Sequence, residues 1–529
     1  MPQAALQWLS LVGAIWLQSI SGTNTNFPAY SSQFKHMLSM SQLQLNNLAF
    51  ASDAGKLLGW FSGIAAVYLP LWLVLIIGSI LGLIGYGFQY LSLINQIPTL
   101  SYPLIFFLTV VAGNSICWIN TVSYVVCIRN FTRNRQVAVG ISTSYQGLSA
   151  KIYADVVGAL FSSSPDKTAK DYLLLNSLFP LIVCFICGPL VGVIDTKSSR
   201  NVDAGFIAMF VITIATGIYS VISSLDSISS EMSALHNLIG TGVLLLVPLA
   251  IPLVAKIREN FPGKLNMNRE NRVYDFTMEE KDDGGARSVE EGVKEEDADH
   301  EQDAGQVVED VSAREEIGAK TMLKRVDFWL YFFVYFCSAT LGMVFLNNLG
   351  QIVESRGSSK TSALVSLSSS FGFFGRLIPS LLDYFLSRSK YMISGPALIV
   401  LLMAPMAGSF FLLLNSTDFC LYISTAIIGV CTGAITSISV LITRDLFGTK
   451  NFSVNHNVVV ANIPIGSFLF GYMAAILYRR ERNGDENCMG MECYTNTFII
   501  WGCVCFLGII LALILYARTR KFYLQKDRS

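Results

Sequence analysis

Two acidic runs stand out near the middle of the sequence: Glu279-Glu280-Lys281-Asp282-Asp283 and Glu295-Glu296-Asp297. They belong to residues 256–325, which hold 19 acidic and 12 basic side chains. So many charges leave too little apolar surface to offset the entropy lost on ordering, so we expect a solvated, disordered linker. Long apolar segments lie on both sides of it. The sequence therefore predicts two membrane-embedded halves joined by a charged loop.

The composition supports a membrane protein and argues against several other classes. Of the 529 residues, 52% are hydrophobic and 14% are charged, whereas soluble proteins carry about 25% charged residues. No basic tract is interleaved with aromatic residues, so we do not expect nucleic-acid binding. The four histidines show no metal-ligand spacing, and no P-loop, HExxH or hydrolase motif is present. We therefore expect no metal, no cofactor and no enzymatic activity.

Hydropathy indicates an all-α protein that crosses the bilayer many times. A helix needs about 20 predominantly apolar residues to cross the hydrocarbon core. Fourteen windows meet this length: residues 6–28, 43–67, 70–91, 103–128, 136–161, 172–193, 204–225, 235–256, 326–350, 361–385, 391–413, 418–443, 455–478 and 496–517. The first window lacks a basic region before it, so we interpret it as a retained span rather than a signal peptide.

The basic residues of the short loops predict the orientation. If the N-terminus is cytosolic, the inner loops and the C-terminal tail hold 14 lysines and arginines, against 8 in the outer loops. This orientation also places the acidic linker in the cytosol, and an even number of spans places both termini there. No retention or anchoring signal separates the plasma membrane from an endomembrane.

Several motifs together resemble one family. They are Ser21-Gly22-Thr23-Asn24, Asp53-Ala54-Gly55-Lys56, Trp118-Ile119-Asn120-Thr121, Tyr145-Gln146-Gly147-Leu148-Ser149, Asn348-Leu349-Gly350-Gln351, Leu446-Phe447-Gly448 and Pro464-Ile465-Gly466-Ser467. The chain outside the linker resembles the plant nodulin-like, or nuclear-fusion-defective-like, branch of the major facilitator superfamily. Two positions depart from that pattern: Thr143 stands where many relatives carry Lys, and Asn347 where many carry Asp.

The resemblance implies a major facilitator fold, in which two six-helix bundles enclose a central cavity. Fourteen spans then include two extra helices, whereas twelve spans would be the alternative. The expected domains are an N-terminal bundle (1–203), an extra helix pair (204–257), the cytosolic linker (258–324), a C-terminal bundle (325–518) and a basic tail (519–529). The resemblance also implies a secondary transporter of a small organic solute, such as a monocarboxylate or an amino acid, with protons as a candidate coupling ion. The rival hypothesis is a non-transporting scaffold or receptor that binds protein partners through the acidic linker.

Two pairs of opposite charges lie within predicted spans. Asp53 and Lys56 are three residues apart, and Lys151 and Asp155 are four apart, so each pair shares one helical face. A charge inside a span costs about 2.5–3.5 kcal/mol on insertion scales and commonly faces the protein interior or a water-filled path. Either pair could be a gate or coupling site, or could neutralise itself and hold helices together.

Arg376 is the third candidate, because its planar, permanently charged side chain suits a carboxylate. It resembles the substrate-binding arginine of carboxylate-transporting facilitators. With Asp383 and Arg388 it also resembles the facilitator signature that closes a helix pair as a cytosolic gate. The alternative is a structural partner for Asp383 or for a backbone carbonyl.

Uncharged polar residues within the spans, among them Asn120 and Tyr145, could orient a polar solute or join helices by hydrogen bonds. Cys488 and Cys493 lie in a loop that the orientation places outside the cytosol, where oxidation is permitted. Their spacing predicts a disulfide that shapes the loop, and two free thiols are the alternative.

Overall fold

The computed structural model describes residues 3–161, 168–194, 203–224, 233–260, 316–358, 360–386, 394–481 and 488–526. Within these ranges the chain forms helices and no strands. Residues 261–315, most of the predicted linker, lie outside the described part, and so does Arg388 of the predicted gate.

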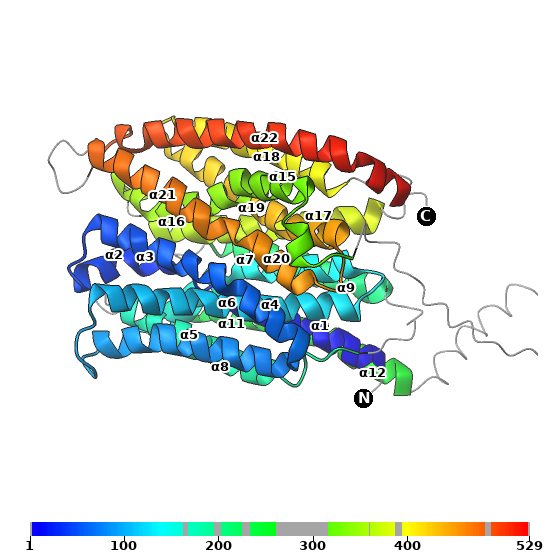
Figure 1. Cartoon of the computed structure of the whole chain (residues 1–529). Helices are drawn as coiled ribbons and strands as arrows, with labels where there is room; N and C mark the ends of the chain where they lie inside the picture. The colour runs from blue at the N-terminus through cyan, green and yellow to red at the C-terminus, as the bar shows by residue number, and fades with distance from the viewer. Residues whose placement is uncertain are drawn as a thin grey trace, which may run out of the picture.

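The helices form two layers (Figure 1). The N-terminal half contains α1 (Gln3–Ile20), α2 (Phe27–Met37), α3 (Gln42–Ala54), the 3₁₀ turn η1 (Gly55–Leu58), α4 (Gly59–Tyr68), α5 (Leu71–Leu93), α6 (Tyr102–Asn130), α7 (Arg135–Leu160) and α8 (Thr168–Cys187). The C-terminal half contains α14 (Ala319–Met322), α15 (Val326–Tyr335), the π-helical turn η4 (Phe336–Thr340), α16 (Leu341–Ser355), α17 (Thr361–Leu386), α18 (Gly395–Leu412), α19 (Asp418–Phe447), α20 (Phe452–Val460), α21 (Asn462–Arg480) and α22 (Glu492–Lys526).

A further helix pair connects the halves in sequence. It consists of α9 (Asp203–Ile222) and a second rod made of α11 (Ala234–Leu246), η3 (Val247–Leu249) and α12 (Ala250–Asn260). The rod packs on α1 and α7, whereas α9 packs on α7 and also on α17 of the C-terminal half. The pair therefore contacts both halves.

Each of the fourteen predicted windows contains helix, and ten helical stretches of the described chain are long and apolar enough to span a membrane. The other four windows contain α1, α3–α4, α7 and α17. Large apolar side chains such as Phe107 and Leu401, both at least 60% exposed, cover the outer surface as expected for contact with lipid. The protein is therefore a multi-pass integral membrane protein, and fourteen as the number of spans stays a prediction.

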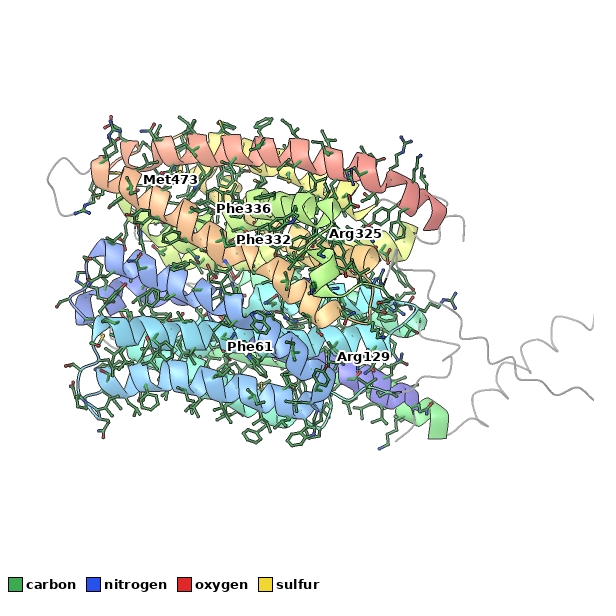
Figure 2. The ribbon with its side chains drawn as sticks, viewed as in Figure 1. Phe61, Arg129, Arg325, Phe332, Phe336 and Met473 are labelled. Atoms are coloured by element: carbon green, nitrogen blue, oxygen red, sulfur yellow. A yellow bond between two sulfur atoms is a disulfide. The ribbon has the colours of Figure 1, made fainter. Side chains whose placement is uncertain are left out.

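The interface between the halves is formed by three pairs of helices. α7 packs along α17, α3 packs against α21, and α4 packs against α20. Both ends of the chain lie at one end of the molecule, here called the terminal end (Figure 1). The labelled side chains of Arg129 and Arg325 lie nearer to it than those of Phe61 and Phe336 (Figure 2). Their position agrees with cationic residues near a membrane surface and apolar residues at greater depth.

The first window was wrong in its extent. α1 ends at Ile20, and the chain turns before α2 begins at Phe27. The turn is held by hydrogen bonds from Ser21 N to Gln18 O and from Thr25 N to Gly22 O. Pro28 in the first turn of α2 then suits a new helix start, because proline lacks the amide hydrogen that would have no partner there.

Candidate solute-binding cavity

A cavity of about 140 Å³ lies between the two halves. Its charged and larger polar lining residues are Asn24, Asp53, Lys56, Asn120, Tyr124, Gln146, Tyr335, Asn347, Arg376, His456 and Asn457. An engineered cavity of about 150 Å³ accommodates benzene, so this form of the cavity has room for a solute of a few heavy atoms. A mixture of cationic, anionic and amide groups would orient a polar solute.

The Asp53–Lys56 pair forms where α3 gives way to η1. A 3₁₀ turn has three residues per turn, so side chains three apart lie above one another. Lys56 Nζ lies 2.6 Å from Asp53 Oδ1, and both residues are buried, at 7% and 2% exposure. The predicted pair therefore exists, and it faces the central cavity.

Asp53 also connects the two halves. Its second oxygen, Oδ2, accepts hydrogen bonds from Asn347 Nδ2 of α16 at 3.1 Å and from Ser467 Oγ of α21. Asn24 Nδ2 adds a long contact to Oδ1 at 3.5 Å. Hydrogen bonds to an ionised acceptor are about twice as strong as neutral ones. A change in the charge of Asp53 would therefore alter the attraction between the halves.

Arg376 projects from α17 into the same cavity. Its one hydrogen bond to the described part of the chain runs from Nη1 to the carbonyl of Gly372, at 3.3 Å. Asp383 lines a different cavity of about 240 Å³, together with Arg133, Arg135 and Arg444. Arg376 thus contacts a backbone carbonyl, as one of the two structural alternatives predicted, and it does not share a cavity with Asp383. The other guanidinium donors make no hydrogen bond to the described part of the chain.

Asn120 and Tyr145 have different surroundings. Asn120 lines the cavity, and within the described residues its carboxamide oxygen accepts no hydrogen bond. Tyr145 is fully buried outside the cavity lining, with its ring edge-on to Phe373 at a centroid distance of 5.4 Å. Asn120 is therefore available to a solute, whereas Tyr145 packs between α7 and α17.

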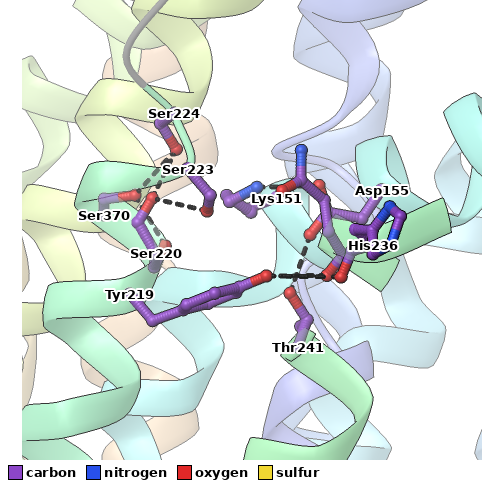
Figure 3. Close-up of polar contacts among 10 residues, drawn as sticks. Lys151, Asp155, Tyr219, Ser220, Ser223, Ser224, His236, Thr241 and Ser370 are labelled. Atoms are coloured by element: carbon purple, nitrogen blue, oxygen red, sulfur yellow. Dashed lines mark hydrogen bonds and ion pairs between the residues drawn. The ribbon is translucent and has the colours of Figure 1, made fainter. Parts of the chain in front are cut away.

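Lys151 and Asp155 form the second predicted pair, with Nζ 2.7 Å from Oδ1. The pair lies outside the lining of the central cavity. Asp155 Oδ2 instead accepts a hydrogen bond from Thr241 Oγ1 of α11 at 2.9 Å, so the pair faces the helix pair (Figure 3). Its role in solute binding or coupling remains a prediction.

The structure joins Cys488 and Cys493 by a disulfide bond. Within the described residues, no three side chains of His, Cys, Asp or Glu are grouped as metal ligands. The exposure of the disulfide to the cell exterior rests on the predicted orientation.

His456 is a cavity residue that the sequence analysis passed over. Its ring stacks on Phe452 at 5.3 Å and meets Tyr124 edge-on at 5.5 Å. Its Nδ1 lies 3.3 Å from Thr443 Oγ1. The signal available in the sequence was the polar run Asn455-His456-Asn457 inside an apolar window.

The fold matches solved transporters along its whole length. A partially occluded inward-open form of the xylose transporter XylE from E. coli superposes with a TM-score of 0.54 at 9% identity, covering 98% of this chain and 99% of that chain. The fucose:proton symporter FucP from E. coli gives 0.52 at 10% identity, covering 97% and 99%. Two helical halves around a central polar cavity therefore define a major facilitator fold.

The sequence comparisons identify the family. The nodulin-like family model matches residues 7–253, and the model for the NFD4 C-terminal domain matches residues 310–525. The protein NUCLEAR FUSION DEFECTIVE 4 from Arabidopsis thaliana is 39% identical over 539 aligned positions, covering 99% of this chain and 90% of that protein. The chain belongs to this nodulin-like, NUCLEAR FUSION DEFECTIVE 4-type family.

Proposed function

We propose that this protein is a secondary transporter that moves a small carboxylate-bearing solute, a monocarboxylate or an amino acid, by alternating access and with protons as the coupling ion. The observation that carries the proposal is Arg376, a cation in the central cavity whose one hydrogen bond to the described chain is to the Gly372 carbonyl. A guanidinium inside a membrane protein favours an anion or several oxygen partners. A carboxylate would supply both.

The opposite wall of the cavity supports proton coupling. Asp53 accepts hydrogen bonds from donors of both halves. Protonation would weaken those bonds and so favour separation of the halves, which alternating access requires. XylE and FucP, which share the fold, are described as proton symporters. The rival scaffold function depends on the linker, most of which lies outside the described residues.

Uptake by the purified protein in proteoliposomes tests the proposal. An inwardly directed proton gradient should drive accumulation of at least one member of a panel of radiolabelled two- to six-carbon carboxylates and amino acids. Arg376→Ala should abolish this uptake. Arg376→Lys keeps the charge but loses the two-pronged geometry, so it should raise the KM and retain some transport.

Arg356 provides the matched control. It lies outside the cavity lining and donates to two backbone carbonyls, Leu413 O at 2.6 Å and Asn415 O at 3.3 Å. Arg356→Lys should leave the KM unchanged. Equal uptake by the wild type, Arg376→Lys and Arg376→Ala would remove Arg376 from the site. Uptake that does not depend on the proton gradient would contradict proton coupling but not the role of Arg376.

A further inference from the structure

The helix pair (residues 203–260) touches both halves, but its two contacts differ in chemistry. On the side of the N-terminal half, Thr241 Oγ1 donates to Asp155, whose other oxygen is paired with Lys151. Farther along the rod, the indole nitrogen of Trp16 donates to Leu245 O at 2.8 Å. Asp155 and Lys151 are 8% and 3% exposed. This side of the pair is therefore held by one charge-assisted hydrogen bond, from Thr241, and one neutral hydrogen bond, from Trp16.

The polar contact with the C-terminal half is made by neutral hydroxyl groups. Ser220 Oγ lies 2.8 Å from Ser370 Oγ of α17, and Ser224 Oγ lies 3.4 Å from the same atom (Figure 3). We call these three residues the serine cluster. Neutral hydrogen bonds are about half as strong as charge-assisted ones, so the serine cluster is the weaker of the two attachments.

The serine cluster is one of two separate contacts between α9 and α17. α9 contacts α17 again through Phe210 and Tyr384, whose ring centroids are 5.4 Å apart. Tyr384 lies in the last turn of α17, whereas Ser370 lies about four turns earlier in the same helix. α9 therefore contacts α17 at two places: through the serine cluster, beside which the rings of Phe373 and Phe374 pack on Gly217, and through the rings of Phe210 and Tyr384.

We infer that the helix pair moves as part of the N-terminal half and that the serine cluster is a clasp, which breaks when the cavity opens at the end opposite the termini. The inference rests on the proposed function, because alternating access must separate α7 from α17 at one end at a time. Three hydroxyl groups can part and find new partners at small cost. The Thr241–Asp155 hydrogen bond is costlier to break, because its loss would leave a buried carboxylate oxygen without its donor.

Two engineered disulfides distinguish the two attachments. Ser220→Cys/Ser370→Cys would bridge α9 to α17 across the clasp. Gly158→Cys/Ala234→Cys is the matched control, because a Cβ at Gly158 would lie 3.7 Å from Ala234 Cβ, within the range of natural disulfides. That bridge would join α7 to α11, two helices that the inference keeps together. Peptide mapping would verify each bridge.

A native cysteine reports the opening without requiring a known substrate. Cys117 lines the central cavity and is 4% exposed. The full chain is reconstituted into vesicles, and a membrane-impermeant maleimide is added on the side opposite the termini. Vesicles with the termini inside are those in which added protease spares a C-terminal tag. The labelling rate of Cys117 is then read by mass spectrometry.

The clasp bridge should slow labelling of Cys117 at least about tenfold, and reduction should restore it, because the bridge removes the open state from the population. The control bridge should change the rate by less than about twofold. Ser370→Ala needs no new bond and should accelerate labelling by weakening the clasp.

Three results would overturn the inference. Unchanged labelling with the clasp bridged would show that α9 and α17 stay together while the transporter opens. Slow labelling with either bridge in place would show that the helix pair does not follow the N-terminal half. If Cys117 is not labelled in any variant, the reduced wild type included, both the proposed transport cycle and the clasp would be contradicted.

Discussion

The two buried ion pairs of the N-terminal half have similar internal geometry and different surroundings. Asp53–Lys56 and Lys151–Asp155 have Nζ–Oδ1 distances of 2.6 and 2.7 Å, and all four residues are at most 8% exposed. Asp53 faces the cavity and accepts hydrogen bonds from the C-terminal half. Asp155 faces the helix pair and accepts one from Thr241. We therefore expect the partner of the second carboxylate oxygen, rather than burial, to distinguish a functional pair from a structural one.

The largest expected effect is the loss of protein stability when the lysine of either ion pair is replaced. Lys56→Met or Lys151→Met leaves a buried carboxylate without its cation, which costs about 3–5 kcal/mol. Asp53 keeps two neutral donors of the C-terminal half, Asn347 and Ser467, whereas Asp155 keeps Thr241. Lys151→Met should therefore lie at the upper end of this range and Lys56→Met at the lower end, as measured by denaturation in detergent. A larger loss of stability in Lys56→Met than in Lys151→Met would contradict the expected role of the second carboxylate oxygen.

The next effect separates the pairs by transport. The charge-free double variant Asp53→Asn/Lys56→Met should regain most of the stability lost in Lys56→Met. Its uptake should still fall about a hundredfold, equivalent to ~2.7 kcal/mol, because the coupling carboxylate is gone. Asp155→Asn/Lys151→Met is the matched control and should retain uptake within about threefold. Equal losses of uptake in both double variants would contradict the prediction that only the Asp53–Lys56 pair takes part in transport.

A smaller effect concerns the single donor from the helix pair. Thr241→Val keeps the shape but removes a hydrogen bond to a charged group, worth about 1.5–3 kcal/mol. Thermal unfolding should detect this loss, and uptake by the folded fraction should stay near wild type. Ser467→Ala removes the corresponding donor to Asp53 and should lower uptake as well. If Thr241→Val lowers uptake without lowering stability, the Lys151–Asp155 pair takes part in transport and the prediction is wrong.

The smallest effect comes from a link that we expect to be purely structural. The Cys488–Cys493 disulfide closes a short loop, so its loss in Cys488→Ser/Cys493→Ser should cost about 2 kcal/mol, the low end of the usual range. Uptake should be unchanged, which gives a reference for a staple without a transport role. Recovery of both residues as free thiols from wild-type protein isolated without reductant would contradict the bridge itself.

Hydropathy was sufficient to locate the helices, because each window had to supply enough apolar residues to cross the lipid. It did not predict the break at Ser21 or the 3₁₀ turn at Gly55, since both depend on local hydrogen bonds and on the packing of neighbouring helices. The charged linker predicted two halves, and the family resemblance supplied their packing around a central cavity.

The candidate site was predicted in part. Asp53, Lys56, Asn120 and Arg376 line the cavity, whereas Tyr145, Lys151 and Asp155 do not. An ionisable residue in an apolar window must find a polar environment, but the sequence does not say how its helix is rotated about its axis. Hydropathy therefore detects Lys151 and Lys56 equally well, and cannot tell which of them faces the cavity.

The close approach of α3–η1 to α6 limits which substitutions the chain can tolerate. A Cβ on Gly55 would overlap the backbone of Val110 and Asn114, and a Cβ on Gly113 would overlap the carbonyl of Ser52. Even alanine at either position would force two backbones apart, beside the turn that sets the distance from Lys56 to Asp53. In a saturation library selected for transport, these two glycines should be as intolerant of substitution as the charged residues they support.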